Sequence, residues 1–265
     1  MESKLSIAVI TLISMIVMTF LLLISENGRV DTQLYFCEQE SNGTFNQPIN
    51  AWSAISFVLI AILITIHSSI HFGSSNSRFH TNCGYPISYS FLVSMIGYSS
   101  MAFHGFGNDW AGNWDVNSVL LFLSYIFALS LGLLFKKTDN IFFMFSWTFF
   151  ACISIGCTAL DIDDVNKFFQ FSYPIASALS NFIVLYGGKR WVDVRPHNIK
   201  CVWAAALFLC ISLVIWTLST TSILCDSKSW FQGHALWHVL DSWTCGLLYL
   251  YLSSDGKKIE IMIIV

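Results

Sequence analysis

The chain has 265 residues, of which 55% are hydrophobic and 11% are charged, with a mean hydropathy of +0.64 and a net charge of −3. Soluble domains carry about 25% charged residues, so a soluble globular protein and a disordered chain are both excluded. The slightly acidic balance offers no basic surface for nucleic acid. A membrane protein with several spans remains, with lipid as its expected partner and no obligate protein partner evident.

Eight stretches are apolar over roughly the 20 residues that a membrane-spanning helix needs. Their apolar runs are continuous and lack the period of two of a β-barrel strand, which predicts an all-α polytopic fold. The connecting loops are short, so no separate soluble domain is expected. The predicted spans are 5–24, 50–70, 87–106, 116–135, 141–160, 168–186, 201–223 and 230–252.

The first stretch has two interpretations, a retained helix or a cleaved signal peptide. Its apolar region is long and no small-residue cleavage site follows Leu23, which favours the retained helix. We therefore divide the chain into an N-terminal span with its flank (1–30), a seven-span domain (31–252) and a C-terminal tail (253–265).

The distribution of Lys and Arg predicts the orientation, because cytosolic loops carry an excess of them. With eight spans, ten of these residues fall on one side of the membrane and three on the other. We therefore predict cytosolic N- and C-termini. The loops 25–49, 107–115, 161–167 and 224–229 then face the lumen or exterior. The three far-side residues are Arg29, Lys167 and Lys228.

Two features of the far-side loops fit that compartment. Asn42 begins an Asn-Gly-Thr glycosylation sequon, a short pattern that also arises by chance. Cys37 and Cys225 are the two cysteines in far-side loops. An oxidising compartment would allow them to form a disulfide, and otherwise they are two unpaired thiols.

Ionisable residues inside spans are candidates for function. His234 and His238 begin the last predicted span at i, i+4 spacing, which places both imidazoles on one helix face, with Asp241 about a turn further on. Two such imidazoles can bind one zinc ion, although a packed polar pair has the same spacing.

A second pair of this spacing ends the third predicted span, where Ser100 precedes His104 by one turn. His104 is a candidate third zinc ligand, and Ser100 would then place a hydroxyl near the metal. A serine inside a span often bonds the carbonyls of its own helix instead.

Asp115 opens the fourth predicted span, where it can act as a helix N-cap or as an acid beside the metal. The orientation derived from Lys and Arg places Asp115, Ser100 and the three histidines at the same membrane level. Three imidazoles that leave a fourth position open are typical of catalytic zinc. Such an ion activates water and polarises a carbonyl, which Asp115 and Ser100 would assist in amide or ester hydrolysis.

The histidine pair in the second span, His67 and His71, has the same i, i+4 spacing but lies toward the opposite, cytosolic end. We interpret these two residues as interfacial or packing residues rather than as metal ligands.

Three blocks of sequence resemble the alkaline ceramidase family, part of a membrane-hydrolase superfamily that also includes adiponectin-receptor-like proteins. The resemblance covers about residues 31–252, and the order and spacing of the blocks agree with the family. The first block holds Cys37, Glu38, Gln47, Pro48, Ile49, Asn50 and Ser53, the second holds Gly97, Ser100, Phe103, His104 and Asp115, and the third runs from Gly233 to His238.

This resemblance implies a seven-helix core, here preceded by one extra helix. It implies a zinc ion held by His104, His234 and His238, with Ser100 as oxyanion donor and Asp115 as proton carrier. The implied reaction is hydrolysis of ceramide to a sphingoid base and a fatty acid. Family members also bridge the N-terminal loop to a later one, which agrees with a disulfide between Cys37 and Cys225.

Calcium is left open. Animal members bind calcium in an acidic loop, to which Glu38 and Glu40 would correspond, but Gln47 and Tyr35 stand where the family has acids. Calcium sites need several oxygen ligands. Two other functions also stay open: a hydrolase of other acyl lipids, and a receptor-like seven-helix protein with a structural zinc.

Overall fold

The computed structural model describes residues 2–26, 36–74, 77–135, 139–160, 172, 175 and 199–254. Over these residues the regular secondary structure is entirely α-helical, as the continuous apolar runs predict. In chain order the helices are α1 (Glu2–Glu26), α2 (Pro48–Ser53), α3 (Ile55–His71), α4 (Arg78–Thr81), α5 (Gly84–Phe106), α6 (Asp109–Leu134), α7 (Asn140–Ala159), α9 (Ile199–Thr220) and α10 (Gly233–Leu252).

Each predicted span that the structure describes overlaps a helix, although the second is interrupted at Ala54 into α2 and α3 and the fourth begins earlier, at Asp109. The predicted span 168–186 lies outside the described residues apart from Ser172 and Ile175, as do the loop 161–167 and most of the C-terminal tail.

Four helical segments of the described chain are long and apolar enough to cross a membrane: Lys4–Glu26, Pro48–His71, Asp109–Leu134 and Ile199–Thr220. The segment Asn140–Gly156 is apolar but shorter. Helices α5 and α10 reach 23 and 20 residues, but they carry histidine, serine and aspartate side chains that lower their hydropathy. The four segments indicate a membrane protein, and the full number of spans stays a prediction.

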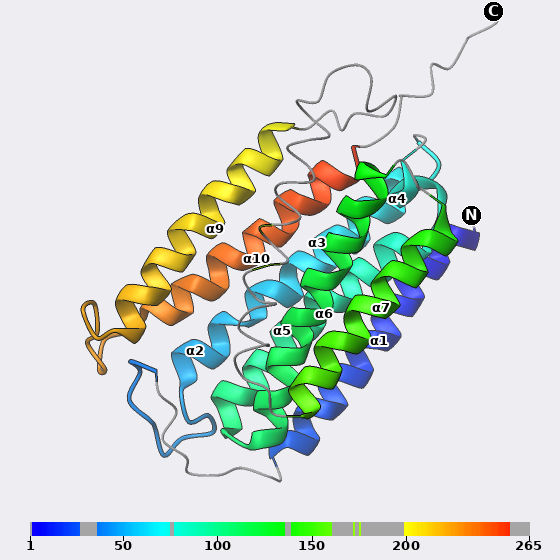
Figure 1. Ribbon diagram of the computed structural model, residues 1–265. Coiled ribbons are helices and arrows are strands. Elements are labelled where there is room, and N and C mark those ends of the chain that lie inside the picture. The colour runs from blue at the N-terminus through cyan, green and yellow to red at the C-terminus, as the bar shows by residue number, and fades with distance from the viewer. Residues whose placement is uncertain are drawn as a thin grey trace, which may run out of the picture. The chain divides into compact units, whose positions relative to one another are not determined.

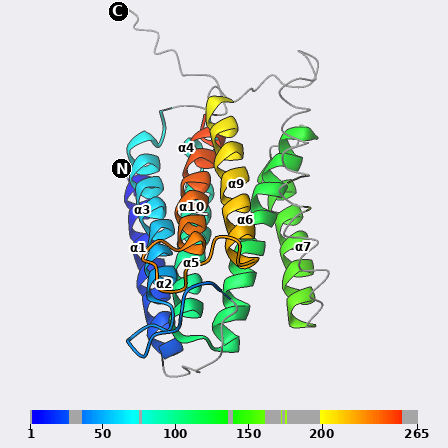
Figure 2. The ribbon, with the colours of Figure 1, turned by 90° about the vertical axis from the view of Figure 1, so that its left-hand side faces the viewer.

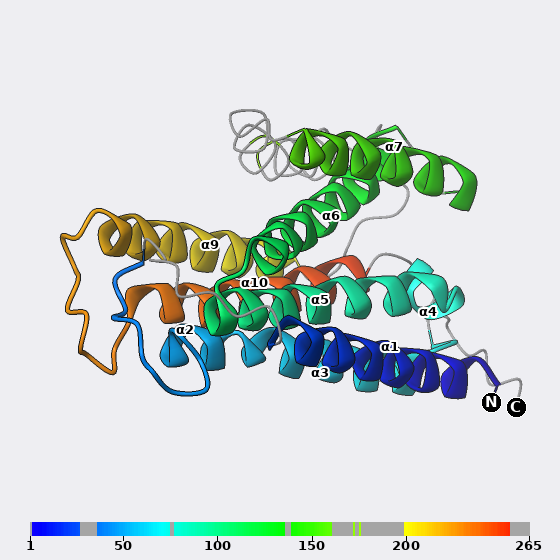
Figure 3. The same ribbon diagram turned by 90° about the horizontal axis from the view of Figure 1, so that it is seen from below.

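The chain forms two compact units, Met1–Gly112 with Pro196–Val265, and Asn113–Arg195. In the first unit, α10 packs against α9, α3 and α2, while α5 packs against α3, α1 and α2. These long helices run alongside one another (Figures 1 and 2). Figure 3 shows the loops that precede α2 and α10 at one end of this bundle, and α4 with the start of α1 at the other end.

Large apolar side chains cover the outer faces of this bundle. Leu5 on α1, Leu59 on α3 and Leu207 on α9 are 65%, 55% and 59% exposed. Exposing apolar surface to water costs about 25 cal/mol per Å², and lipid removes that cost. The outer surface therefore fits a hydrocarbon environment.

Gly97 lets α5 approach the junction of α2 and α3 closely. A Cβ atom at this position would lie 2.9 Å from the carbonyl oxygen of Ala54 and 2.9 Å from Cγ2 of Val58. Only a residue without a side chain fits there. This approach brings the C-terminal turns of α5, with Ser100 and His104, against the segment that begins α2.

The predicted loop 107–115 is wrong, because α6 begins at Asp109 and leaves two residues between the helices. Gly107 ends α5 in the left-handed conformation, with φ of 66°. Asn108 then starts α6, since its side-chain oxygen accepts a hydrogen bond from the backbone N–H of Ala111 at 2.8 Å. Asp115 therefore lies inside α6, and the interpretation of Asp115 as an N-cap is also wrong.

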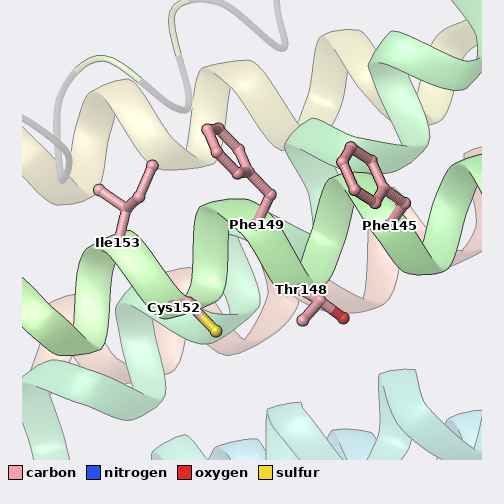
Figure 4. A pocket seen from close by; sticks show the side chains of 5 residues that line it. All are labelled: Phe145, Thr148, Phe149, Cys152 and Ile153. Atoms are coloured by element: carbon pink, nitrogen blue, oxygen red, sulfur yellow. The ribbon is translucent and has the colours of Figure 1, made fainter.

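In the second unit, α7 starts at a capped end, where Asp139 Oδ1 accepts from the backbone N–H of Phe142 at 2.8 Å. Trp147 on α7 donates its indole N–H to the carbonyl oxygen of Leu121 on α6 at 3.3 Å. A hollow of this unit (Figure 4) is lined from α7 alone, by Phe145, Thr148, Phe149, Cys152 and Ile153, and its lining is mainly apolar.

Candidate metal centre

Three buried histidines from two helices meet at the end of the first unit that carries the long loops. His104 lies in the last turn of α5, while His234 and His238 occupy the first turns of α10. One ligand nitrogen from each lies within 4.8 Å of the others, and among the described residues this is the group of His, Cys, Asp and Glu side chains able to hold a metal ion. The structure thus brings together the three ligands predicted from sequence.

The orientation of His104 is set by Gln47. The side-chain oxygen Oε1 of Gln47 lies 2.9 Å from Nδ1 of His104. An amide oxygen can only accept, so Nδ1 carries the proton and Nε2 carries the lone pair. That lone pair is directed toward Nε2 of His234, 3.0 Å away.

His238 is oriented in the same way from the start of α2. Its Nδ1 lies 3.1 Å from the backbone carbonyl oxygen of Asn50 and 2.8 Å from Oγ of Ser53. Because the carbonyl is an acceptor, Nδ1 is again the protonated nitrogen. Nε2 of His238 then carries a lone pair, and it accepts a hydrogen bond from the hydroxyl of Ser100 at 3.2 Å.

His234 supplies the test of whether a metal fits. Its Nδ1 is buried and has no hydrogen-bond partner within the described chain, while its Nε2 faces the lone pair of His104. Without a metal, Nε2 of His234 must carry a proton in order to donate a hydrogen bond to Nε2 of His104. With zinc–nitrogen bonds of about 2.0–2.1 Å, tetrahedral ligands lie about 3.3–3.4 Å apart. The Nε2 atoms of His104 and His234 are 3.0 Å apart, and the three ligand nitrogens lie within 4.8 Å of one another. The donor set therefore fits a metal ion.

Ser100 lies one turn before His104 and is 2% exposed. Its hydroxyl contacts His238 on α10. The hydroxyl of the adjacent Ser99 instead donates to the carbonyl oxygen of Ile96 on its own helix, at 3.1 Å. The candidate catalytic serine is thus placed beside the histidine group.

Asp115 lies within α6, in the second unit. Its backbone carbonyl accepts the hydroxyl of Ser118 at 2.7 Å. Its role at the metal therefore stays a prediction. Asp241, the next acidic residue along α10, accepts the Ser212 hydroxyl from α9 at 2.6 Å and joins these two helices.

The loop of residues 36–47, which we call the α2 arm, covers the centre. The ring of Phe36 lies 4.8 Å from that of His104 and 4.3 Å from that of His234, measured between centroids. A disulfide joins Cys37 to Cys225, with Cα atoms 5.4 Å apart. The backbone N–H of Gln39 donates to the carbonyl oxygen of Ser227 at 3.0 Å. The arm is thereby attached to the loop that leads into α10.

Glu38 is buried in this arm, and its carboxylate accepts hydrogen bonds from backbone N–H groups at the start of α2. One oxygen accepts from the N–H of Ile49 at 2.7 Å and the other accepts from the N–H of Asn50 at 2.8 Å. Burial raises the pKa of the Glu38 carboxyl, while the two backbone hydrogen bonds oppose that rise. Glu40 is exposed. These bonds give Glu38 a structural role, and calcium binding by Glu38 and Glu40 stays a prediction.

The roles of Gln47, Asn50 and Ser53 in orienting the histidines were not predicted. The three residues recur at intervals of three across the start of a helix, so they share one face of it. That polar face in an apolar span was the available signal. Phe36 gave no signal in the sequence.

The histidine pair of the second span lies at the opposite end of the bundle, beside α4. The rings of His67 and His71 stack at 4.2 Å, and Nδ1 of His67 lies 2.9 Å from the hydroxyl of Tyr249. His80 on α4 joins them, with its ring 6.3 Å from that of His67. These packing contacts agree with the interpretation of the pair as packing residues.

No protein-family model, curated protein or solved structure matches the chain. The fold and the site by themselves define a class: a helical membrane protein with a buried three-histidine centre that can hold a metal ion.

Proposed function

We propose that the protein is a zinc-dependent hydrolase that cleaves the amide bond of ceramide within the membrane. The observation that carries this proposal is the buried convergence of His104, His234 and His238. Three imidazole donors suit zinc, and three protein ligands leave a position for water and substrate, as in catalytic rather than structural sites. The resemblance to alkaline ceramidases supplies the substrate.

Bound zinc would lower the pKa of its water to about 7 and polarise the scissile carbonyl. The protein residues have separate roles in this proposal. Gln47 and Asn50 hold Nδ1 of His104 and of His238, so that both Nε2 lone pairs face inward. Ser100 donates a hydrogen bond from its hydroxyl to the oxyanion that develops on the carbonyl. Asp115 takes a proton from the attacking water and returns it to the leaving amine.

The reaction that follows from these roles is an addition of water to the carbonyl and a loss of the sphingoid amine. A lipid substrate is supported by the apolar outer faces of the bundle, and in this proposal the ceramide enters the buried site from the bilayer. We further propose a seven-helix core formed by the spans after α1, with both termini cytosolic and the centre toward the lumenal side.

The test is mass spectrometry of the lipid products from the purified full-length chain in ceramide-containing micelles. We expect a sphingoid base and a fatty acid in equal amounts, and loss of both products after treatment with a zinc chelator. His238→Gln should also abolish both products. The matched control is His71→Gln, which changes a histidine at the opposite end of the bundle and should keep turnover. Turnover that survives both the chelator and His238→Gln would contradict the proposal.

The two other functions correspond to defined outcomes. Release of fatty acid from a lysophospholipid or another ester but not from ceramide would assign a different acyl-lipid substrate. One equivalent of zinc without release of fatty acid from any lipid would assign a receptor-like protein with structural zinc.

A further inference from the structure

Glu38 of the α2 arm is linked to two of the histidines by chains of hydrogen bonds. The backbone carbonyl of Glu38 accepts from Nε2 of Gln47 at 3.1 Å, and Oε1 of Gln47 in turn bonds Nδ1 of His104. The carboxylate of Glu38 accepts from the N–H of Asn50, whose carbonyl bonds Nδ1 of His238. Both chains of hydrogen bonds are buried, because Glu38, Gln47 and Asn50 are 5%, 0% and 0% exposed.

The arm is also fixed to α5 by its backbone. The N–H of Gln47 donates to the carbonyl oxygen of His104 at 3.0 Å, and the N–H of Asn46 donates to that of Gly105 at 2.8 Å. Gln47 therefore touches His104 through both its backbone and its side chain. Its position determines both the ring direction and the protonated nitrogen of that histidine.

The other end of the arm is held covalently. Cys37 directly precedes Glu38, and its disulfide to Cys225 fixes the arm to the loop before α10, which bears the other two histidines. Gln39 and Ser227 add one backbone hydrogen bond to this junction. The Cys37 end of the arm is thus held to the loop before α10 mainly by the disulfide, and this end gains conformational freedom when the disulfide opens.

We propose that the Cys37–Cys225 disulfide is a redox-sensitive tether that controls how firmly the histidine centre holds its metal, with Gln47 as the positioning residue that transmits the effect to His104. This inference rests on the proposed metal binding. Partners that orient a metal-bound histidine contribute about 10–100-fold to metal affinity. Opening the tether frees the Cys37 end of the arm next to Glu38, which loosens the hydrogen bonds from Glu38 to Gln47 and Asn50 and lowers that contribution.

The chemical step is reduction of the disulfide by a thiol or a phosphine. A dithiol reductant gives two protein thiols and becomes a disulfide itself. A phosphine also gives two protein thiols, and it becomes a phosphine oxide by taking oxygen from water. The phosphine is the better probe, because dithiols compete for metal ions.

The experiment loads the full-length chain in detergent micelles with Co²⁺, whose visible absorption reports its ligands, and measures release into excess chelator. We expect release from the phosphine-treated protein to be about 10–100-fold faster than from the oxidised protein. The double variant Cys37→Ser with Cys225→Ser should release Co²⁺ fast and show no further response to phosphine. Cys152→Ser, at an exposed cysteine on α7, is the matched control and should behave as the parent protein.

Two variants test the role of Gln47. Gln47→Ala should release Co²⁺ about 10–100-fold faster even when oxidised. Gln47→Glu keeps an acceptor for Nδ1 and should restore slow release. If Gln47→Ala destabilises the fold in a thermal melt, the comparison of oxidised and reduced parent protein still decides the question.

Equal release rates from oxidised and reduced protein would overturn the tether, and a full response to phosphine in Gln47→Ala would overturn the route through Gln47. An oxidised chain that binds no Co²⁺ at all would instead overturn the proposed metal centre itself. A second measurement follows from the reciprocity of coupled equilibria. Bound Co²⁺ should shift the equilibrium between the disulfide and the two thiols toward the disulfide, and an equilibrium independent of Co²⁺ would also contradict the tether.

Discussion

The Nδ1 atoms of His104 and His238 each form a hydrogen bond with an oxygen atom of the segment at the start of α2. In each ring, Nε2 is therefore the nitrogen that can bind a metal. Ser100 lies beside the same group of atoms. Its hydroxyl is 3.2 Å from Nε2 of His238, and in the proposed mechanism it donates a hydrogen bond to the substrate carbonyl. At the scale of residues, catalysis depends on which of these side chains touch the substrate and which only orient a ligand.

Ser100→Ala tests the oxyanion role. We expect the metal content to stay at the parent level, because serine is not a ligand, and kcat for ceramide hydrolysis to fall by about 10²–10³-fold. Ser99→Ala is the control, since that neighbouring hydroxyl bonds its own helix, and kcat should stay within a factor of two or so of the parent value. Unchanged kcat in Ser100→Ala would remove Ser100 from the mechanism.

Asp115→Asn tests the proton carrier without a change of size. An amide cannot take a proton from water, so turnover should fall by about 10²–10⁴-fold while zinc content and thermal stability are retained. Asp109→Asn, in the first turn of the same helix, serves as the comparison and should keep its turnover. A fully active Asp115→Asn enzyme would show that another group carries the proton.

The sequence predicted the metal ligands but not the residues that orient them. His234 and His238 share a helix face through their spacing, and the topology places His104 at the same end. Gln47 bonds a histidine that is 57 positions away, and such a contact depends on how α2 packs against α5. No local pattern in the sequence encodes that packing.

At the scale of helices, Gly97 sets how closely α5 approaches the α2–α3 junction, and therefore how closely the last turns of α5, with Ser100 and His104, lie to the start of α2. Gly97→Ala should destabilise the protein by about 1–3 kcal/mol, because the added Cβ meets a backbone carbonyl that cannot move aside. We expect a lower unfolding temperature in detergent and a lower kcat.

Gly156→Ala is the matched control for Gly97→Ala. It lies on α7, where an added Cβ meets nothing within 4 Å, so the substitution should stabilise the helix by about 0.5–1 kcal/mol. If both variants changed stability in the same direction, the close approach of α5 would not be the cause of the effect.

Helix existence was easier to predict than helix ends. Long apolar runs predicted α1, α7 and α9 within a few residues. The start of α6 at Asp109 was missed because it depends on one left-handed glycine and one asparagine side chain, which start the helix before its apolar run begins. The interruption of the second span at Ala54 was also missed, because the apolar run continues through it and gives no sign of a break.

At the scale of the whole molecule, the two ends of the first unit differ in chemistry. One end has the disulfide-linked loops and the histidine centre, and the other end has Lys4, Arg78 and the cluster of His67, His71 and His80. Figure 3 shows the loops before α2 and α10 at one end and α4 at the other. Lys and Arg concentrate on the cytosolic side of membrane proteins, and disulfides form in oxidising compartments. Both rules predict the same orientation, in which the histidine centre lies away from the cytosol.

Glycosylation tests this orientation directly in the full-length chain made in eukaryotic cells. Asn42 is exposed in the α2 arm, five residues after the disulfide-bonded Cys37, and should carry a glycan that an endoglycosidase removes and Asn42→Gln abolishes. Arg78→Thr creates a second sequon, at Asn76, on the predicted cytosolic side, and there we expect no glycan because that end never meets the lumenal enzyme. A glycan at Asn76 with none at Asn42 would reverse the orientation. Reversal would place the disulfide in a reducing compartment, so the same result would also remove the reason for the tether to stay closed.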